Sequence, residues 1–242
     1  MAHEHPDPRL AADETDAVRE RYARRIPQDP RYSLLNPAAL LPAQERQRAI
    51  ARLFARLGWQ DLEQRHMLEV GCGAGGNLLE LLRLGCAPER LQGVELLEAR
   101  AAEARRVLPA ALQVHCGDAL ALGERVAAGS QDVVYQATVF SSLLDDSFQA
   151  QLAQAMWRWV RPGGGVLWYD FTWDNPRNPD VRGVGVARLR QLFPEGRASV
   201  QRITLAPPLA RALVRLHPGL YAVFNTLPWL RTHVLAWIEK RP

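Results

Sequence analysis

The feature that most constrains the fold is a glycine-rich turn between an apolar segment and a leucine-rich segment. His66–Val70 is typical of a short buried strand, and Asn77–Leu84 is typical of a helix. Between them, residues 71–76 read Gly-Cys-Gly-Ala-Gly-Gly, which satisfies both G-x-G-x-G and the dinucleotide pattern G-x-G-x-x-G. A strand, a glycine turn and a helix in this order predict a loop that holds a nucleotide cofactor.

The carboxylate before the glycines separates the two patterns. Glu69 lies just ahead of Gly71 in the chain. A carboxylate at this place repels a pyrophosphate seated on the helix N-terminus, but it suits a cationic ligand that carries an amino acid. The loop therefore favours S-adenosylmethionine over NAD.

Length and composition are those of an ordinary globular chain. The 242 residues are 48% hydrophobic and 23% charged, as in soluble domains. No apolar run approaches the roughly 18 residues that a membrane-spanning helix needs, and Met1–Leu10 lacks the apolar core of a signal peptide. We therefore expect a cytoplasmic protein without a membrane span.

Cysteines and charges give no sign of a metal or of a nucleic-acid partner. Cys72, Cys86 and Cys116 form no C-x-x-C pair and no ligand cluster with the six histidines. The net charge is +4, but the basic residues are scattered. The densest basic segment, Arg19–Arg31, is interpreted as a solvated helix face, with an RNA-binding arm as the alternative.

Strands and helices alternate along the chain. The expected strands are His66–Val70, Leu91–Glu95, Leu112–Cys116, Asp132–Ala137, Gly165–Phe171, Ser199–Leu205 and His233–Ile238. The expected helices are Asp16–Arg25, Gln44–Gly58, Asn77–Leu84, Leu97–Leu108, Ser147–Val160, Val186–Phe193 and Pro207–Phe224. This alternation predicts a parallel sheet covered by helices, with ligands at the carboxyl ends of the strands.

Four motifs, in this order, resemble those of class I S-adenosylmethionine-dependent methyltransferases. The first is the glycine loop with Glu69, and the second is Gly93-Val94-Glu95, whose acidic residue follows Gly71 by 24 positions. The third is Cys116-Gly117-Asp118-Ala119. The fourth is Gln131–Thr138 together with Arg161–Gly165. The resemblance covers Gln44–Phe171 and extends toward Lys240.

The resemblance implies a doubly wound, Rossmann-like α/β fold. Its sheet has seven strands, mainly parallel, with an antiparallel last strand. Residues 1–43 are then a mobile segment and helical lid, and residues 44–242 are a single methyltransferase domain with a helical insertion at 207–226. We expect a monomer or homodimer.

The resemblance also implies a cofactor site for S-adenosyl-L-methionine, which leaves as S-adenosyl-L-homocysteine, and no metal. Glu95 is expected at the ribose hydroxyls and Asp118 at the adenine amino group, unless they are an exposed strand-end carboxylate and a turn residue. Gln136 faces the cofactor or is a capping group. The expected cofactor-binding residues are Glu69, Gly71, Cys72, Gly73, Gly75, Asn77, Glu95, Leu96, Gly117, Asp118, Ala119 and Gln136.

The acceptor is expected to be a small molecule or a glycan. Gln136–Ser142 lacks the Asn/Asp-Pro-Pro-Tyr/Phe loop of many enzymes that methylate amines of bases or glutamine amides. Leu167–Gly183 is rich in aromatic, amide and charged side chains, which stack on sugars and bind hydroxyls, and it is similar to a bacterial subgroup associated with saccharide biosynthesis. The expected substrate-binding residues are Tyr32, Asn36, Phe140, Ser141, Trp173, Asn175, Asn178 and Arg182.

A general base is optional, because positioning alone can supply on the order of 7–11 kcal/mol. Asp170 is the first candidate and Tyr169 the second, since strand alternation points only one of them into the pocket. A loop-capping carboxylate and a buried aromatic are the alternatives. O-methylation is the preferred function. An RNA or protein methyltransferase, a lipid or quinone methyltransferase that uses the insertion as its channel, and a non-catalytic cofactor-binding protein stay open.

Overall fold

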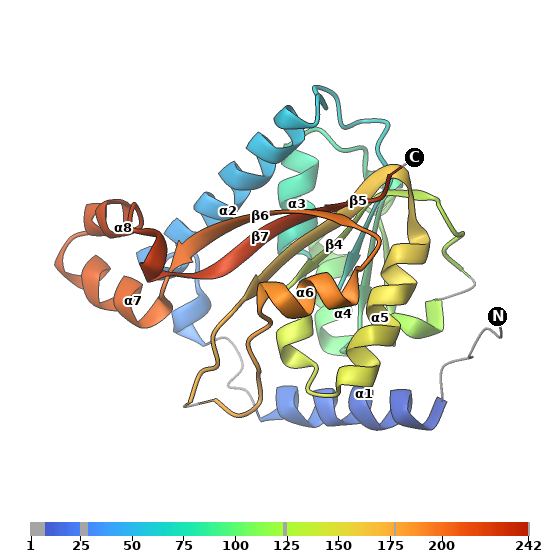
Figure 1. Ribbon diagram of the computed structural model, residues 1–242, viewed down its shortest axis with the longest axis horizontal. Coiled ribbons are helices and arrows are strands. Elements are labelled where there is room, and N and C mark those ends of the chain that lie inside the picture. The colour runs from blue at the N-terminus through green and yellow to red at the C-terminus, as the bar shows by residue number, and fades with distance from the viewer. Residues whose placement is uncertain (1–7, 25–28, 123–124, 177, 242) are drawn as a thin grey trace.

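The computed structural model describes residues 8–24, 29–122, 125–176 and 178–241. They form a three-layer α/β fold around one seven-stranded sheet with the order β3-β2-β1-β4-β5-β7-β6 (Figure 1). The strands are β1 Met67–Val70, β2 Leu91–Glu95, β3 Gln113–Cys116, β4 Gln131–Ala137, β5 Val160–Phe171, β6 Arg197–Leu205 and β7 Arg231–Glu239. The first five strands are parallel, and β7 runs antiparallel to both β5 and β6. The predicted fold class is confirmed.

The helices follow the predicted order. The α-helices are α1 Pro8–Ala23, α2 Pro37–Arg56, α3 Gly76–Arg83, α4 Glu98–Val107, α5 Asp146–Trp159, α6 Val186–Leu192, α7 Pro207–Leu216 and α8 Gly219–Phe224. The 3-10 helices are η1 Pro30–Tyr32, η2 Pro88–Arg90, η3 Leu120–Leu122, η4 Phe140–Ser142 and η5 Pro228–Leu230. No helix in the described ranges is long and apolar enough to cross a membrane.

Three element starts differ from the prediction by more than two residues. Helix α1 begins at Pro8 and not at Asp16. Helix α2 begins at Pro37 because Asn36 caps it, its side chain accepting a hydrogen bond of 2.9 Å from the Ala38 amide. Strand β5 begins at Val160, the last residue of the expected helix, and not at Gly165, and Val160 pairs with Gln131 across a register shift.

The sheet separates two apolar cores. One face packs against α5, α6 and α1 and includes Val166 and Trp168 of β5. The other face packs against α2, α3 and α4 and includes Leu167 and Tyr169 of the same strand. Strand alternation therefore sends Tyr169 and Asp170 to opposite faces.

A third apolar cluster lies at one end of the molecule. Helices α7 and α8, with η5, form a lobe (residues 207–230) that projects beyond the sheet at the left of Figure 1. The buried residues of the cluster are Leu205 of β6 and Ala210, Leu213 and Tyr221 of the lobe, and Leu41 of α2 packs against them. The 207–224 segment is thus a pair of short helices joined by a turn at Pro218, where one continuous helical stretch was expected.

Candidate cofactor and active site

A cavity of about 770 Å³, counting its open mouth, lies at the carboxyl ends of β1, β2 and β4. The sequence-predicted cofactor residues on its wall are Gly71, Glu95, Leu96, Gly117, Asp118 and Ala119. Thr15, Val18 and Tyr22 of α1 line it as well. The structure therefore brings together predicted residues from separate loops and adds one helix that the motifs did not include.

The first two glycines of the loop are required by geometry. Gly71 has φ +68° and Gly73 has φ +57°, which L-residues rarely adopt. A Cβ at Gly71 would lie 2.5 Å from Cγ2 of Val139, and one at Gly73 would lie 2.5 Å from a guanidinium nitrogen of Arg100. The bare backbone lets the turn pass close to both side chains. Gly75, also with positive φ, caps α3.

Glu95 is a buried anchor of the glycine loop. Its Oε2 accepts a hydrogen bond of 2.8 Å from the Gly73 amide, and its Oε1 accepts one of 2.9 Å from the Leu97 amide. The residue is only 5% exposed, yet it reaches the cavity wall. The alternative of an exposed strand-end carboxylate is therefore wrong.

Asp118 lies on the cavity wall in the turn after β3. Its Oδ1 accepts a hydrogen bond of 2.9 Å from the Leu120 amide, as a turn residue would, while the residue also lines the cavity. Burial raises the pKa of this carboxyl, and the Leu120 amide partly offsets that effect. The turn role and the place on the cavity wall are compatible.

A buried polar chain lies behind the loop, on the α2 side of the sheet. Asn77 donates a hydrogen bond of 2.5 Å to Glu69 Oε1, and Arg46 donates one of 2.7 Å to Asn77 Oδ1. Glu69 Oε2 and Arg46 Nε are buried and have no hydrogen-bond partner among the described residues. Burial raises the pKa of Glu69 to about 8. The site thus holds one spare acceptor and one spare donor, and each is costly to leave unpaired.

Arg46 was missed by sequence reasoning, although a signal was present. It lies four residues before Ile50 and seven before Leu53, so it falls on the buried stripe of α2. A charged residue on an apolar stripe marks a buried polar site. Neither Arg46 nor Glu69 lines the cavity at the carboxyl ends of the strands.

Two further predicted cofactor residues, Cys72 and Gln136, are buried and have packing or capping roles. Cys72 is buried beside Gly93, where its sulfur would lie 2.7 Å from an added Cβ, and burial raises the pKa of its thiol. Gln136 is fully buried, and its Oε1 accepts a hydrogen bond of 3.0 Å from the Val139 amide. Gln136 therefore caps the turn after β4, which was the alternative reading.

Thr138 follows β4 and lines the cavity with a strained backbone. Its φ is +59°, which is an outlier for a β-branched residue. Its amide donates a hydrogen bond of 2.8 Å to the Tyr169 carbonyl, and its own carbonyl accepts from the hydroxyls of Ser141 and Ser142. Such strain is concentrated at functional sites. No sequence signal marks this residue, because the strain arises only when the turn closes.

The two candidate bases are both buried away from the cavity. Asp170 is fully buried, and it accepts hydrogen bonds of 3.2 Å from the Ser141 amide and 3.0 Å from the Phe171 amide. Burial raises its pKa to about 7. The hydroxyl of Tyr169 bonds Thr204 Oγ1 at 3.0 Å. The expectation that one of them faces the pocket is corrected: Asp170 anchors the turn at Ser141, and Tyr169 packs on the far face.

None of the eight expected substrate-binding residues is on the cavity wall, and four of them lie outside the loop between β5 and α6. Phe140 is fully buried and packs on Trp168 at a ring separation of 4.6 Å, and Ser141 is buried beside Asp170. Asn36 caps α2, and Tyr32 is exposed and does not line the cavity. Their residue types suited a sugar site, but Phe140 and Ser141 are buried in the core and Asn36 caps a helix, while Tyr32 lies exposed.

The loop between β5 and α6 contacts α1, the helix that lines the cavity, and the turn after β4. Arg182 donates its amide to the Ser141 carbonyl at 2.8 Å and pairs with Asp146. Asp180 pairs with Arg24 of α1 at 2.6 Å. Asn178 Oδ1 accepts from the Asp180 amide, while Asn175 is exposed, as is Trp173 at 63%. The loop thus joins α1 to the turn after β4 and presents an unburied indole.

Comparison with known proteins agrees with this geometry. Residues 67–164 match the family model described as a methyltransferase domain. No curated protein matched the sequence at a significant level. A SAM-dependent methyltransferase from Archaeoglobus fulgidus is 14% identical with a TM-score of 0.57, over 83% of this chain and 98% of that one.

Two further solved structures show how varied the chemistry on this fold is. Geranyl diphosphate C-methyltransferase from Streptomyces coelicolor A3(2), determined with S-adenosyl-L-homocysteine, is 14% identical with a TM-score of 0.54, over 79% of this chain and 77% of that one. The [4+2]-cyclase SpnF is 13% identical with a TM-score of 0.54, over 81% and 82%. At these identities the likeness shows the fold and leaves the substrate open. Residues 67–164 are therefore a methyltransferase domain, and the chain has the class I fold of the S-adenosylmethionine-dependent methyltransferases that it resembles.

Proposed function

We propose that this enzyme methylates a hydroxyl of a sugar, a glycan or another small polar metabolite. The observation that carries the proposal is the exposed Trp173 on a polar loop that is pinned to both α1 and the turn after β4. An indole face offers a stacking platform, and neighbouring amide and charged side chains bind hydroxyls. We expect Trp173, Asn175 and Asn178 to contact the acceptor.

The residues present fit the cofactor. The cavity supplies Glu95 for the ribose hydroxyls and Asp118 for the adenine amino group. Behind the glycine turn, the spare oxygen of Glu69 suits an ammonium group and the spare Nε of Arg46 suits a carboxylate. This acceptor and donor match the two charges of an amino acid, and they support the methionine part of the cofactor at this end of the site.

Catalysis by this chain is then chiefly positioning. The bound cofactor supplies a methyl group that is already activated for displacement. The protein's part is to orient acceptor and donor, which can contribute on the order of 7–11 kcal/mol. Thr15, Val18 and Tyr22 of α1 line the cavity and form part of its wall. No residue is assigned as a base, since Asp170 is occupied by backbone amides.

The test is transfer of a labelled methyl group from S-adenosylmethionine into a cell extract separated into polar metabolites, glycans, lipids, RNA and protein. We expect label in the metabolite or glycan fraction. Trp173→Ala should raise the KM for that acceptor, with cofactor affinity and thermal stability unchanged, because the indole is exposed. Leu79→Ala, at an exposed position on α3, is the matched control.

Other outcomes contradict the proposal. Label in RNA or protein would make Arg19–Arg31 the acceptor surface. Label in lipid would favour the apolar lobe as the acceptor channel. Tight cofactor binding with no labelled product in any fraction would favour a non-catalytic function.

A further inference from the structure

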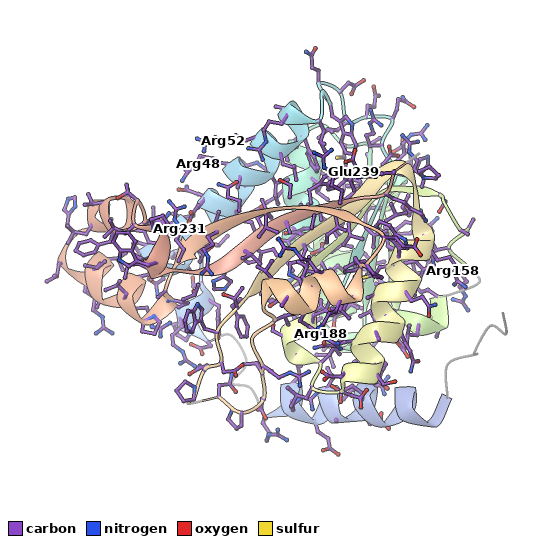
Figure 2. The ribbon with its side chains drawn as sticks, in the orientation of Figure 1. Arg48, Arg52, Arg158, Arg188, Arg231 and Glu239 are labelled. Atoms are coloured by element: carbon purple, nitrogen blue, oxygen red, sulfur yellow. The ribbon has the colours of Figure 1, made fainter. Side chains whose placement is uncertain are left out.

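The lobe, defined as α7, α8 and η5 (residues 207–230), lies in a stretch without acidic residues. From Arg202 to Arg231 the chain has four arginines and no aspartate or glutamate. Arg231 is used internally: its guanidinium donates to the carbonyls of Asn225 at 2.7 Å and Arg202 at 3.0 Å, at the neck between lobe and sheet (Figure 2). The lobe's surface charge is therefore positive only.

Two arginines on α7 have no ion pair within the described ranges. Arg211 and Arg215 lie four residues apart, so they share one face of the helix, where like charges destabilise it. A hydrogen bond from Arg31 is the main cause of the lowered pKa of Asp29, with the charge of Arg211 a smaller one. Arg31 already bonds both oxygens of Asp29. The pair on α7 is thus left for an external anion.

Large apolar side chains are exposed at the same end. Of the nine large apolar residues exposed in the described parts of the chain, three are in the lobe and three immediately precede α2. They are Leu216, Val223 and Trp229, and Tyr32, Leu34 and Leu35. Trp229 is 73% exposed and Leu35 is 96% exposed.

The two groups belong to one end of the molecule. Leu41 of α2 packs into the apolar cluster of α7, α8 and η5. The charge of Arg211 also acts on Asp29, at the start of the segment that leads into α2. In Figure 1 the beginning of α2 lies beneath the lobe. The exposed apolar side chains and the two arginines of α7 therefore lie at one end of the molecule's longest axis.

We propose that this end of the protein binds the surface of an anionic membrane. A short amphipathic helix with arginines on its polar side and tryptophan and aliphatic side chains beside it is suited to the boundary between headgroups and acyl chains. Tryptophan prefers that boundary, and arginine binds lipid phosphate. With 10 and 6 residues, α7 and α8 lie on such a surface and do not cross it.

A second copy of the chain is a poor occupant of the same surface. A twofold dimer through the lobe would bring Arg211 and Arg215 of both copies into one interface, with no carboxylate in the lobe to pair with them. Like charges that face each other oppose association. A negatively charged lipid surface removes this repulsion.

The test is flotation of the full chain with phosphatidylcholine vesicles that contain or lack phosphatidylglycerol. We expect binding to the mixed vesicles, weakened by salt. Arg211→Gln with Arg215→Gln should weaken it about twenty-fivefold, since each arginine near an anionic surface contributes about fivefold. Leu216→Ser with Val223→Ser and Trp229→Ser should weaken binding at least tenfold. Leu79→Ser with Val107→Ser removes exposed apolar side chains on α3 and α4 and should leave binding unchanged.

The proposal concerns this surface alone and holds for any acceptor. Unchanged thermal midpoints and cofactor affinity in the lobe variants show that the chain is still folded. The proposal is overturned if folded protein fails to float, or if the lobe variants and the control bind equally. It is also overturned if light scattering shows a wild-type dimer that the triple variant dissolves while no vesicle binding is seen.

Discussion

Gly73 donates its backbone amide to Oε2 of Glu95 at 2.8 Å, so the carboxylate that ends β2 also holds the glycine loop that follows β1. One side chain thereby joins two of the motifs that were recognised separately in the sequence. Loop shape and the proposed ribose contact depend on the same residue.

Replacing Glu95 should therefore affect more than a single contact. We expect Glu95→Ala to weaken cofactor binding by about 1–3 kcal/mol through the lost hydrogen bonds, and to lower the thermal midpoint because the Gly73 and Leu97 amides lose their acceptor. Calorimetric titration and thermal unfolding measure the two effects. Glu98→Ala, at an exposed position on α4, is the control, and equal behaviour of both variants would remove Glu95 from the site.

Cofactor binding should depend on pH through Glu69. Burial raises the pKa of this carboxyl to about 8, so it is protonated at neutral pH until a cation pairs with it. Below about pH 7, where the cofactor's α-amino group is itself protonated, we expect binding to release a proton from Glu69 and affinity to fall as pH falls. Calorimetry in two buffers of different ionisation enthalpy measures the release. Glu69→Gln should abolish it; an unchanged release would assign the proton to another group.

Asp170 is expected to support the turn after β4 and not the proton transfer. In Asp170→Asn the remaining carbonyl oxygen still accepts from a backbone amide, so we expect turnover to fall less than about tenfold and cofactor affinity to persist. Asp170→Ala leaves the Ser141 and Phe171 amides unpaired and should destabilise the protein by about 1–3 kcal/mol for each. A loss of 10²-fold or more in the asparagine variant, with stability retained, would restore Asp170 as the base.

The same carboxyl has a predictable effect on stability. Burial raises the pKa of Asp170 to about 7 in the folded state, against 3.8 for an ordinary aspartate, so the unfolded chain ionises first as pH rises. The free energy of unfolding should therefore fall between about pH 4 and pH 7. Asp170→Asn should flatten this dependence in denaturant titrations across that range; an unaltered slope would mean that Asp170 is ionised when folded.

Thr138 should exchange stability for function. Its φ of +59° costs about 1–3 kcal/mol for a β-branched residue, and glycine adopts it freely. We expect Thr138→Gly to raise the free energy of unfolding by about 1 kcal/mol after the added freedom of the unfolded chain is counted, while turnover falls because a cavity wall is lost. Thr204→Gly has the same backbone conformation but removes the partner of the Tyr169 hydroxyl, so it should not stabilise. Destabilisation by Thr138→Gly would show that the turn is not strained.

Much of the fold was predictable because its signals are local. The seven strands were recognised from short apolar runs, and the turn after the first strand was recognised from the spacing of its glycines. Gly71 and Gly73 in that turn have a positive φ and a neighbouring side chain where a Cβ would lie. The starts of α1 and α2 were placed too late. In α2 the helix continues through Pro42, a residue type that usually interrupts a helix. Capping by Asn36 determined where that helix begins.

The sequence by itself determined the order of the motifs, the alternation of strands and helices, and the carboxylates Glu69, Glu95 and Asp118, because each depends on residue type and spacing along the chain. Only the tertiary structure decided that Asp170 is occupied by the Ser141 amide, that Arg46 meets Asn77, and that α1 lines the cavity. Burial and hydrogen-bond partners come from segments far apart in the chain, so the same aspartate can be a base or an anchor depending on which backbone amides the fold brings to it.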